Sequence, residues 1–243
     1  MKTVKFLFVL LFILSTPLQL FGRVTESAEN LLRIIHKVNR HWQENNSPQV
    51  RSFWDNAAYH TGNMEVYELT GNTAYLKYST DWAEYNHWKG AASDNKAEWR
   101  YGYGETPQYV LFGDWQCCFQ TYADLYGIRG DDRRIARARE VLEYQMGTDK
   151  NDYWWWADGL YMVMPVMTKL YRITKNPLYL EKLYEYFSYA DSVMYDPEAG
   201  LYYRDGSFVY PKHSILGGKK DFWARGDGWV LAAFAKGLQD LPE

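Results

Sequence analysis

A repeated helix–turn–helix unit constrains the fold of this chain more than any other feature of its sequence. Segment 67–76 (YELTGNTAYL) matches segment 171–180 (YRITKNPLYL) at a constant offset of 104 residues, and a weaker copy begins at 126–130 (YGIRG). Each copy joins two antiparallel helices through a tight turn. Helical hairpins of this length bury their apolar faces only against neighbouring hairpins. The repeat therefore predicts an all-α fold of packed hairpins, either an open solenoid or a closed α/α toroid.

The spacing of apolar residues predicts eight helices. They are expected at 27–45, 54–70, 73–88, 114–126, 132–146, 156–174, 177–194 and from about 226 to 241, with a hairpin-like excursion at 195–222. The long loops, rich in aromatic and charged residues, fall at the opposite ends of the hairpins from the short turns, which favours a toroid with one functional mouth. A closed toroid of six hairpins has twelve helices, so we expect a toroid that lacks its C-terminal part.

The first 22 residues have the pattern of a secretory signal peptide. Lys2 and Lys5 precede an unbroken apolar run at 6–14, and Ser-Thr-Pro ends the run, which is too short to span a bilayer. We expect residues 1–22 to direct export to the periplasm or the cell exterior, without a stable membrane anchor. Residues 23–243 then form the toroid domain.

Charge and composition exclude several classes of function. Without residues 1–22 the chain has 25 Lys and Arg (27 minus 2) against 30 Asp and Glu, a net charge of −5, which does not suit a nucleic-acid partner. The sequence has no metal-ligand spacing and no nucleotide-binding motif, so we expect no metal and no cofactor. The aromatic content of 18% favours carbohydrate binding, because flat rings pack on sugar faces.

Two carboxylates are the candidate catalytic groups. Asp158 lies in the aromatic run 154–162 (WWWADGLYM), where burial would raise its pKa toward the range that a general acid needs. Asp114 lies in the string FGDWQ at 112–116. Both begin even-numbered helices, which form the inner ring of a toroid, so both are expected at the same mouth. For each, the alternative is an ordinary helix N-cap.

Segment 221–229 (DFWARGDGW) is the candidate binding motif for an acidic sugar. Arg225 and Trp229 are four residues apart and share a helix face, offering a guanidinium for a carboxylate and a ring for stacking. The alternative is a surface ion pair of Arg225 with Asp227 or Asp221.

Three further residues are weaker candidates for the same mouth. His213 lies in the preceding loop, and the alternative for it is a solvent-exposed position. Tyr59 and His60 lie near the start of the second helix and could line the cleft, although packing between helices is an equally good interpretation.

The strings GDWQ at 113–116, WADGLYM at 156–162 and FWARGDGW at 222–229 resemble those of the unsaturated rhamnogalacturonyl hydrolases of glycoside hydrolase family 105, which is related to the unsaturated glucuronyl hydrolases of family 88. The resemblance covers about 54 to 242. It implies an (α/α)6 toroid that removes the 4,5-unsaturated uronic acid from the non-reducing end of lyase-generated pectin fragments. It implies Asp158 as the acid/base, Asp114 as a supporting carboxylate, and Arg225, Trp229 and His213 as substrate contacts. The ring of Trp156, in the aromatic run beside Asp158, is expected to pack on the sugar.

Two other classes of function remain open on the sequence alone. One is a different α/α-toroid enzyme, either an inverting glycosidase with two carboxylates or an epimerase with a pair of histidines. The other is a non-catalytic glycan-binding protein of the cell envelope, which would keep the tryptophans and Arg225 without needing Asp158.

Overall fold

The computed structural model describes residues 27–241, and the chain divides into two compact units, Met1–Ser47 and Pro48–Glu243. In the first unit, residues 27–45 form an α-helix, as predicted. The predicted signal peptide at 1–22 lies outside the described residues.

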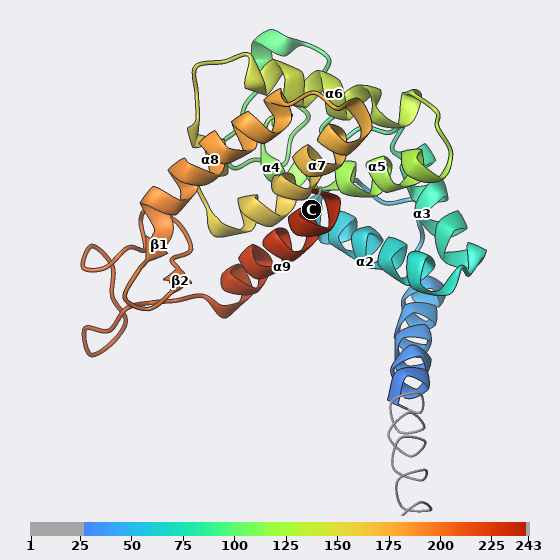
Figure 1. The fold of residues 1–243 in the computed structure, drawn as a ribbon, viewed down its shortest axis with the longest axis horizontal. Coiled ribbons are helices and arrows are strands. Elements are labelled where there is room, and N and C mark those ends of the chain that lie inside the picture. Colours follow the sequence, from blue (N-terminus) through green and yellow to red (C-terminus); the bar gives the residue numbers. More distant parts are fainter. Residues whose placement is uncertain (1–26, 242–243) are drawn as a thin grey trace, which may run out of the picture. The chain divides into compact units, whose positions relative to one another are not determined.

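The second unit is all-α apart from one short hairpin, which confirms the predicted fold class (Figure 1). Its two strands, β1 (Tyr195–Asp196) and β2 (Leu201–Tyr202), pair antiparallel with Tyr195 opposite Tyr202, inside the predicted excursion. The helices are α2 (Trp54–Thr70), α3 (Thr73–Tyr85), α4 (Gly113–Gln116), α5 (Cys118–Ile128), α6 (Arg133–Met146), α7 (Ala157–Thr174), α8 (Leu178–Met194) and α9 (Ala224–Asp240), with 3₁₀ turns at Lys96–Glu98 and Asp152–Trp154.

Two predicted helix boundaries were wrong. The helix expected at 73–88 ends at Tyr85, because His87 and Trp88 take positive φ angles of 52° and 58° that no right-handed helix accommodates. The helix expected at 114–126 is divided at Cys117 into α4 and α5. The backbone of Cys117 keeps right-handed helical angles, so the two pieces follow each other closely.

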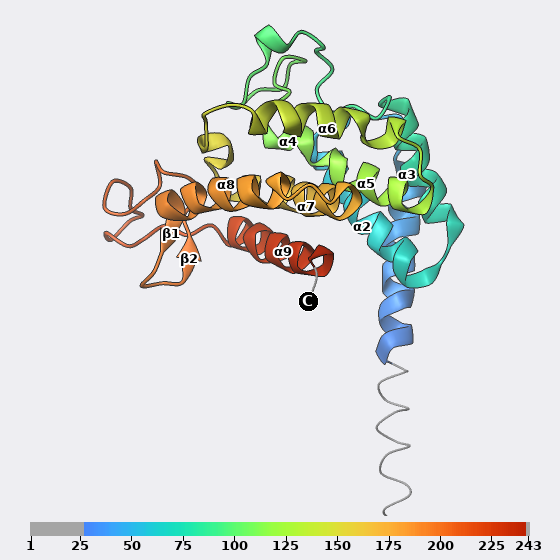
Figure 2. The same ribbon diagram turned by 45° about the horizontal axis from the view of Figure 1, so that its top comes forward.

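The helices alternate between an inner and an outer layer, as the toroid prediction requires (Figures 1 and 2). Helices α2, α5, α7 and α9 pack side by side in that order. Helices α3, α6 and α8 each pack on the inner helix that precedes them. The inner helices are the even-numbered ones of the sequence prediction.

The repeat recognised in the sequence is a repeat of one hydrogen-bonded turn. The hydroxyls of Thr70 and Thr174 each donate to the carbonyl four residues earlier, at 2.7 and 2.8 Å, and accept from the N–H two residues later. Asn72 and Asn176 then accept from the N–H two residues further on, at 3.0 and 3.1 Å, which begins the next helix. In both copies the residue between has positive φ, 66° and 58°.

A side chain from α5 compensates for a proline inside α7. Pro165 has no N–H, so the carbonyl of Tyr161, four residues earlier, loses its helical donor. The side-chain amide of Gln120 donates to that carbonyl at 2.7 Å. Gln120 is fully buried, so this hydrogen bond fixes α5 against α7 inside the core.

Candidate active site

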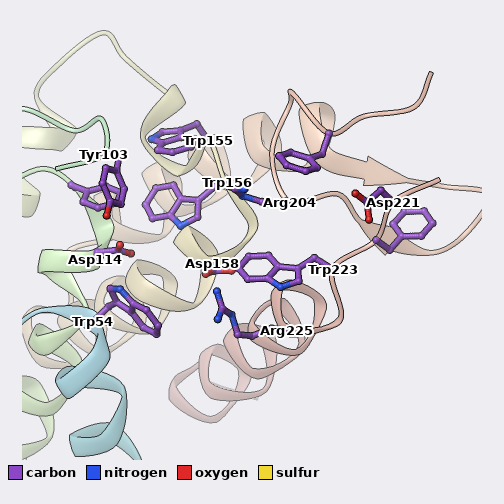
Figure 3. A pocket seen from close by; sticks show the side chains of 13 residues that line it. Trp54, Tyr103, Asp114, Trp155, Trp156, Asp158, Arg204, Asp221, Trp223 and Arg225 are labelled. Carbon is purple, nitrogen blue, oxygen red and sulfur yellow. The ribbon is translucent and has the colours of Figure 1, made fainter. Parts of the chain in front are cut away.

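A cavity of about 600 Å³ lies where the long loops meet the N-terminal ends of the inner helices (Figure 3). Its volume is that of a typical small-molecule site. Its position confirms the prediction that the long loops share one mouth. The lining residues are Trp54, Tyr103, Phe112, Asp114, Trp155, Trp156, Asp158, Arg204, Phe208, Asp221, Phe222, Trp223 and Arg225.

The structure brings Asp158 and Asp114 together in this cavity. Each is the second residue of its helix, α7 or α4, and is only 8% or 7% exposed. The N-cap positions belong to Trp156 and Phe112, and neither helix start has a side-chain cap hydrogen bond. The N-cap alternative is therefore excluded for both carboxylates.

Burial raises the pKa of both carboxyl groups, but by different amounts. The pKa of Asp158 rises to about 6 through burial, opposed by the positive charges of Arg225 and Arg204. The pKa of Asp114 rises to about 8 through burial, with further contributions from the negative charge of Asp158 and more distant carboxylates. Near neutral pH, Asp114 therefore keeps its proton while Asp158 is largely ionised.

Asp158 also has an unused hydrogen-bonding atom. Its Oδ1 is buried and has no hydrogen-bond partner within the described residues. An orphaned carboxylate oxygen costs free energy in the folded protein, and such groups occur where a ligand supplies the missing partner. A molecule in the cavity could therefore form a hydrogen bond with this oxygen of Asp158.

Two glycines explain how the Trp156 ring fits next to the two carboxylates. A Cβ on Gly159 would meet the Trp156 ring at 3.1 Å, and a Cβ on Gly113 would meet it at 3.0 Å. The indole therefore lies against α7 and α4 directly beside Asp158 and Asp114. This contact accounts for the glycine next to each aspartate in the two sequence motifs.

Arg225 forms no ion pair with another residue in the described part of the chain. Its guanidinium lies 4.1 Å from the centre of the Trp223 ring and 5.8 Å from that of Trp54 (Figure 3). The ion-pair alternative is excluded, because Asp227 accepts from the N–H of Tyr202 at 2.7 Å and Asp221 lies 2.7 Å from His213. Two indoles hold the guanidinium in place without neutralising it.

Arg204 is a second guanidinium in the cavity, and no sequence motif predicted it. Its carbonyl accepts from the N–H of Ala157 at 2.8 Å, and Trp156 pairs with Asp205 in an isolated antiparallel bridge. These contacts hold the 195–222 excursion against the start of α7. Because Arg204 is 46 residues from Asp158 (204 minus 158), no local spacing could have placed the two together.

The structure places Tyr59 and His60 outside the cavity. His60 is 2% exposed, and its ring stacks on that of Trp82 with ring centres 3.9 Å apart. Its Nδ1 lies 3.0 Å from the hydroxyl of Ser79. Burial lowers its pKa to about 3, so the ring is neutral. Tyr59 packs edge-on against His60 at 5.2 Å. Both residues contribute to packing between helices, the alternative given above.

Trp229 and His213 do not line the cavity either. Trp229 packs on Tyr161 with ring centres 4.3 Å apart, one helical turn below Arg225. His213 Nε2 lies 2.7 Å from Oδ2 of Asp221, so His213 contacts a residue that lines the cavity without lining it itself. Their predicted contact with substrate stays a prediction.

Most of the cavity residues missed by sequence reasoning are aromatic. Trp54, Trp155 and Trp223 stand at helix starts or just before them, a position that a search for aromatics beside the long loops would have found. Trp154, from the same aromatic run, is instead buried against Tyr186.

Residues 27–241 contain no metal-binding cluster and no membrane-spanning helix. No group of three or more His, Cys, Asp or Glu side chains there could hold a metal ion. None of the helices in that range combines the length and the apolar character needed to cross a bilayer.

Comparison with known proteins gives a consistent family. A curated relative, the unsaturated 3S-rhamnoglycuronyl hydrolase of Formosa agariphila, is 28% identical over 199 residues, covering 78% of this chain and 51% of the relative. A solved family 88 glycosyl hydrolase from Bacteroides vulgatus is 69% identical with a TM-score of 0.87, covering 88% of this chain and 62% of that protein. A solved protein described as a polysaccharide lyase is 71% identical, also with a TM-score of 0.87, covering 89% of this chain and 61% of that protein.

The chain thus spans about half the length of the curated relative and about three fifths of the two solved proteins. The sequence profile of Glycosyl Hydrolase Family 88 matches residues 28–243. This match confirms the resemblance drawn from the motifs, and the chain belongs to glycoside hydrolase family 88.

Proposed function

We propose that the cavity binds a 4,5-unsaturated uronic acid at the non-reducing end of a lyase-generated oligosaccharide and that Asp158 catalyses its removal by hydration of the C4=C5 double bond. The observation that carries this proposal is that one aromatic cavity contains both the Arg225 guanidinium, which forms no ion pair, and the Asp158 carboxyl group, whose pKa is raised. Arg225 offers a planar fork for the uronate carboxylate. Asp158 stands beside it with an unused oxygen.

The reaction needs one carboxyl group to act twice. Protonated Asp158 gives its proton to C4 of the enol ether, which leaves positive charge at C5. The resulting carboxylate then takes a proton from the water that attacks C5. The product is a hemiketal, which opens and releases the aglycone, so the net change is addition of one water molecule. A pKa of about 6 keeps both forms of Asp158 accessible near neutrality.

The neighbouring sugar is proposed to be rhamnose, as in rhamnogalacturonan fragments of pectin. Support for a rhamnose-linked uronic acid comes from the curated relative, whose described substrate is rhamnoglycuronyl. The aromatic rings of Trp155, Trp156 and Trp223 supply flat faces for the two sugars.

A second candidate function is the elimination reaction that creates such double bonds. The protein described as a polysaccharide lyase is 71% identical to this chain, and the two carboxyl groups of the site suit elimination equally well. Ionised Asp158 would take the C5 proton of a uronate whose carboxylate pairs with Arg225. Protonated Asp114, whose pKa is about 8, would give its proton to the leaving oxygen at C4.

One assay separates the two reactions, because hydration destroys the ultraviolet absorbance of the C4=C5 double bond and elimination creates it. Full-length protein carrying this segment is incubated with an unsaturated uronyl–rhamnose disaccharide and, separately, with a saturated polymer of the same sugars. Hydrolase activity predicts falling absorbance with the disaccharide, whereas lyase activity predicts rising absorbance with the polymer.

The variant Asp158→Asn is expected to reduce the rate by about 10²- to 10⁴-fold in either reaction, with an unchanged circular dichroism spectrum. Normal turnover by Asp158→Asn would refute its catalytic assignment. Binding of the disaccharide by wild-type protein, with no absorbance change in either assay, would favour a non-catalytic glycan-binding protein.

We also propose that the protein is exported, on the strength of the charged and apolar pattern of residues 1–22. Fractionation of cells that express the full gene tests this: the protein is expected in the periplasm or medium, and recovery of unprocessed protein from the cytoplasm would contradict export.

A further inference from the structure

A second cavity lies at the opposite end of the hairpins from the active cavity. Its volume is about 590 Å³, and none of the described residues lines both cavities. One wall is the face of α3 that runs from Asn72 to Asp81, and the other is the turn between α5 and α6 with the start of α6. Both views of the fold show α3 beside this turn (Figures 1 and 2). This turn-end pocket is therefore a separate candidate for ligand binding.

Arg134 is a buried guanidinium in the wall of the turn-end pocket. The residue is only 8% exposed, and its guanidinium lies 5.0 Å from the centre of the Trp88 ring. Its Nη1 donates to the carbonyl of Leu125 at 2.6 Å, whereas its buried Nε has no hydrogen-bond partner within residues 27–241. Buried polar groups are normally satisfied, so an unsatisfied guanidinium beside a cavity indicates a ligand that supplies the missing acceptor.

Arg129 is a second cation of the turn-end pocket, and its side chain is exposed. Its backbone N–H donates to the carbonyl of Leu125 at 3.2 Å. The same carbonyl thus accepts hydrogen bonds from Arg129 and Arg134, which fixes both residues at the end of α5.

The carboxylates around the turn-end pocket are engaged by other cations. Asp81, which lines the pocket, lies 2.6 Å from Nζ of Lys77. Asp131, in the turn before α6, lies 2.6 Å from a guanidinium nitrogen of Arg133. Neither Arg129 nor Arg134 forms an ion pair with another residue in the range 27–241, so the pocket has two positive charges without protein counter-ions.

The rest of the lining is largely apolar and includes Ala74, Leu76 and Ile128. A uronic acid matches this combination, because its carboxylate can pair with a guanidinium while the C–H face of its ring packs on apolar side chains. Inorganic phosphate would pair with the arginines but leave the apolar wall without a contact.

We propose that the turn-end pocket binds a uronate residue of an acidic polysaccharide, as a glycan-binding site separate from the active cavity. The choice of ligand rests on the proposed function, because a protein that acts on uronyl oligosaccharides encounters the polymers from which they derive. The pocket would hold the protein on such a polymer while the active cavity, at the other end of the hairpins, remains free.

The test is electrophoresis of full-length protein in native gels that contain a saturated polyuronate, with a gel containing a neutral polysaccharide as the reference. All proteins carry Arg225→Gln, which weakens anion binding in the active cavity. The polyuronate is expected to retard the protein, and Arg129→Gln to weaken the apparent affinity by about three- to tenfold. Arg134→Gln should weaken it by about tenfold or more. Circular dichroism checks that Arg134→Gln is folded, and the exposed Arg129 supplies the result if it is not.

Arg133→Gln is the matched control, because it removes the same charge from a neighbouring exposed residue that does not line the turn-end pocket. It is expected to remain retarded. Equal weakening by Arg133→Gln and Arg129→Gln would show general charge attraction and overturn the site, as would equal mobility in the two gels. Free inorganic phosphate is also compared with a saturated uronate oligosaccharide as a competitor. If phosphate competes equally well, the assignment to a uronate is wrong.

The absorbance assays separate failure of this site from failure of the proposed function. With Arg225 intact, Arg129→Gln is expected to leave kcat/KM for the unsaturated disaccharide unchanged. If wild-type protein shows no turnover in either assay but Arg129→Gln still reduces retardation, the proposed function fails and the turn-end site is supported. Turnover without retardation by the polyuronate would refute the turn-end site alone.

Discussion

The side-chain amide of Gln120 donates to the carbonyl of Tyr161 at 2.7 Å, the carbonyl that Pro165 deprives of its helical donor. Replacing the amide by an isosteric apolar group leaves a buried carbonyl without a partner. Gln120→Leu is therefore expected to lower the free energy of unfolding by about 1–3 kcal/mol in urea titrations. In a Pro165→Ala background the helix regains its own N–H donor, so the loss should shrink. An equal loss in both backgrounds would show that the amide has another role.

Substitution of Gly159 should disturb the site more than the fold. Gly159→Ala brings a methyl group to 3.1 Å from the Trp156 ring, which must move away from position 159 by a few tenths of an ångström. We expect kcat/KM to fall about three- to tenfold. The control is Gly127→Ala in α5, where a methyl group meets no atom within 4 Å. It should leave kcat/KM unchanged and stabilise the helix by about 0.5–1 kcal/mol.

Loss of the Arg225 guanidinium should weaken recognition of the uronate. Arg225→Gln is expected to reduce kcat/KM by about 10- to 100-fold, since a charge-assisted bidentate contact is lost. Arg225→Lys keeps the charge but not the planar fork that stacks on Trp223, so it should recover only part of the loss. Full activity of Arg225→Gln would exclude Arg225 as the carboxylate receptor.

The pH dependence of kcat/KM reports which form of Asp158 reacts. Hydration requires the protonated form, so the rate should fall as the pH rises through the pKa of Asp158, about 6. Elimination requires the ionised form, so its rate should instead rise through that pKa and fall again near the pKa of Asp114, about 8. Arg204→Gln removes a positive charge that lowers the pKa of Asp158. The part of the pH–rate profile that reflects titration of Asp158 should therefore move to higher pH. If that part of the profile does not move in Arg204→Gln, it reflects the titration of a group other than Asp158.

The buried His60 should make the protein less stable in acid. In the folded state its pKa is about 3, below the ordinary value of 6.5, so the unfolded chain binds a proton that the folded chain does not. The free energy of unfolding therefore decreases as the pH falls from about 6.5 toward 3, by about 2 kcal/mol between about pH 8 and about pH 5. His60→Gln cannot titrate and should lose this part of the dependence. His41→Gln, at an exposed helix position, is the control that should keep it.

Periodicity and the turn repeat were sufficient to predict the helices, their inner and outer layers and the shared mouth. These features follow from local hydrogen bonds, as at Thr70 and Asn72, and from apolar faces that recur along one helix. The positive φ angles of His87 and Trp88 carry no comparable signal, because neither position is a glycine, the residue that usually marks such angles in a sequence.

The site was predictable only where its residues belong to helix starts. Asp114, Asp158 and Arg225 come from motifs next to the helices that aim them. Arg204 is held at the cavity by a backbone hydrogen bond with Ala157. Two helices and a loop separate these residues in the sequence, so no sequence pattern predicts the contact. His60 was predicted as a possible cleft residue but is buried, since a histidine near a helix start can equally well face the core.

In the hairpins closed by the matched turns at 70–72 and 174–176, one end stabilises the fold and the other end carries the loops of the cavity. Each turn is closed by hydrogen bonds from its own side chains. These bonds do not depend on the loops that line the cavity at the other end of the hairpin. Loops can then be lengthened or exchanged without rebuilding the scaffold. The two reactions proposed above, addition of water to a sugar double bond and the elimination that forms one, would then differ in the loops rather than in the hairpins.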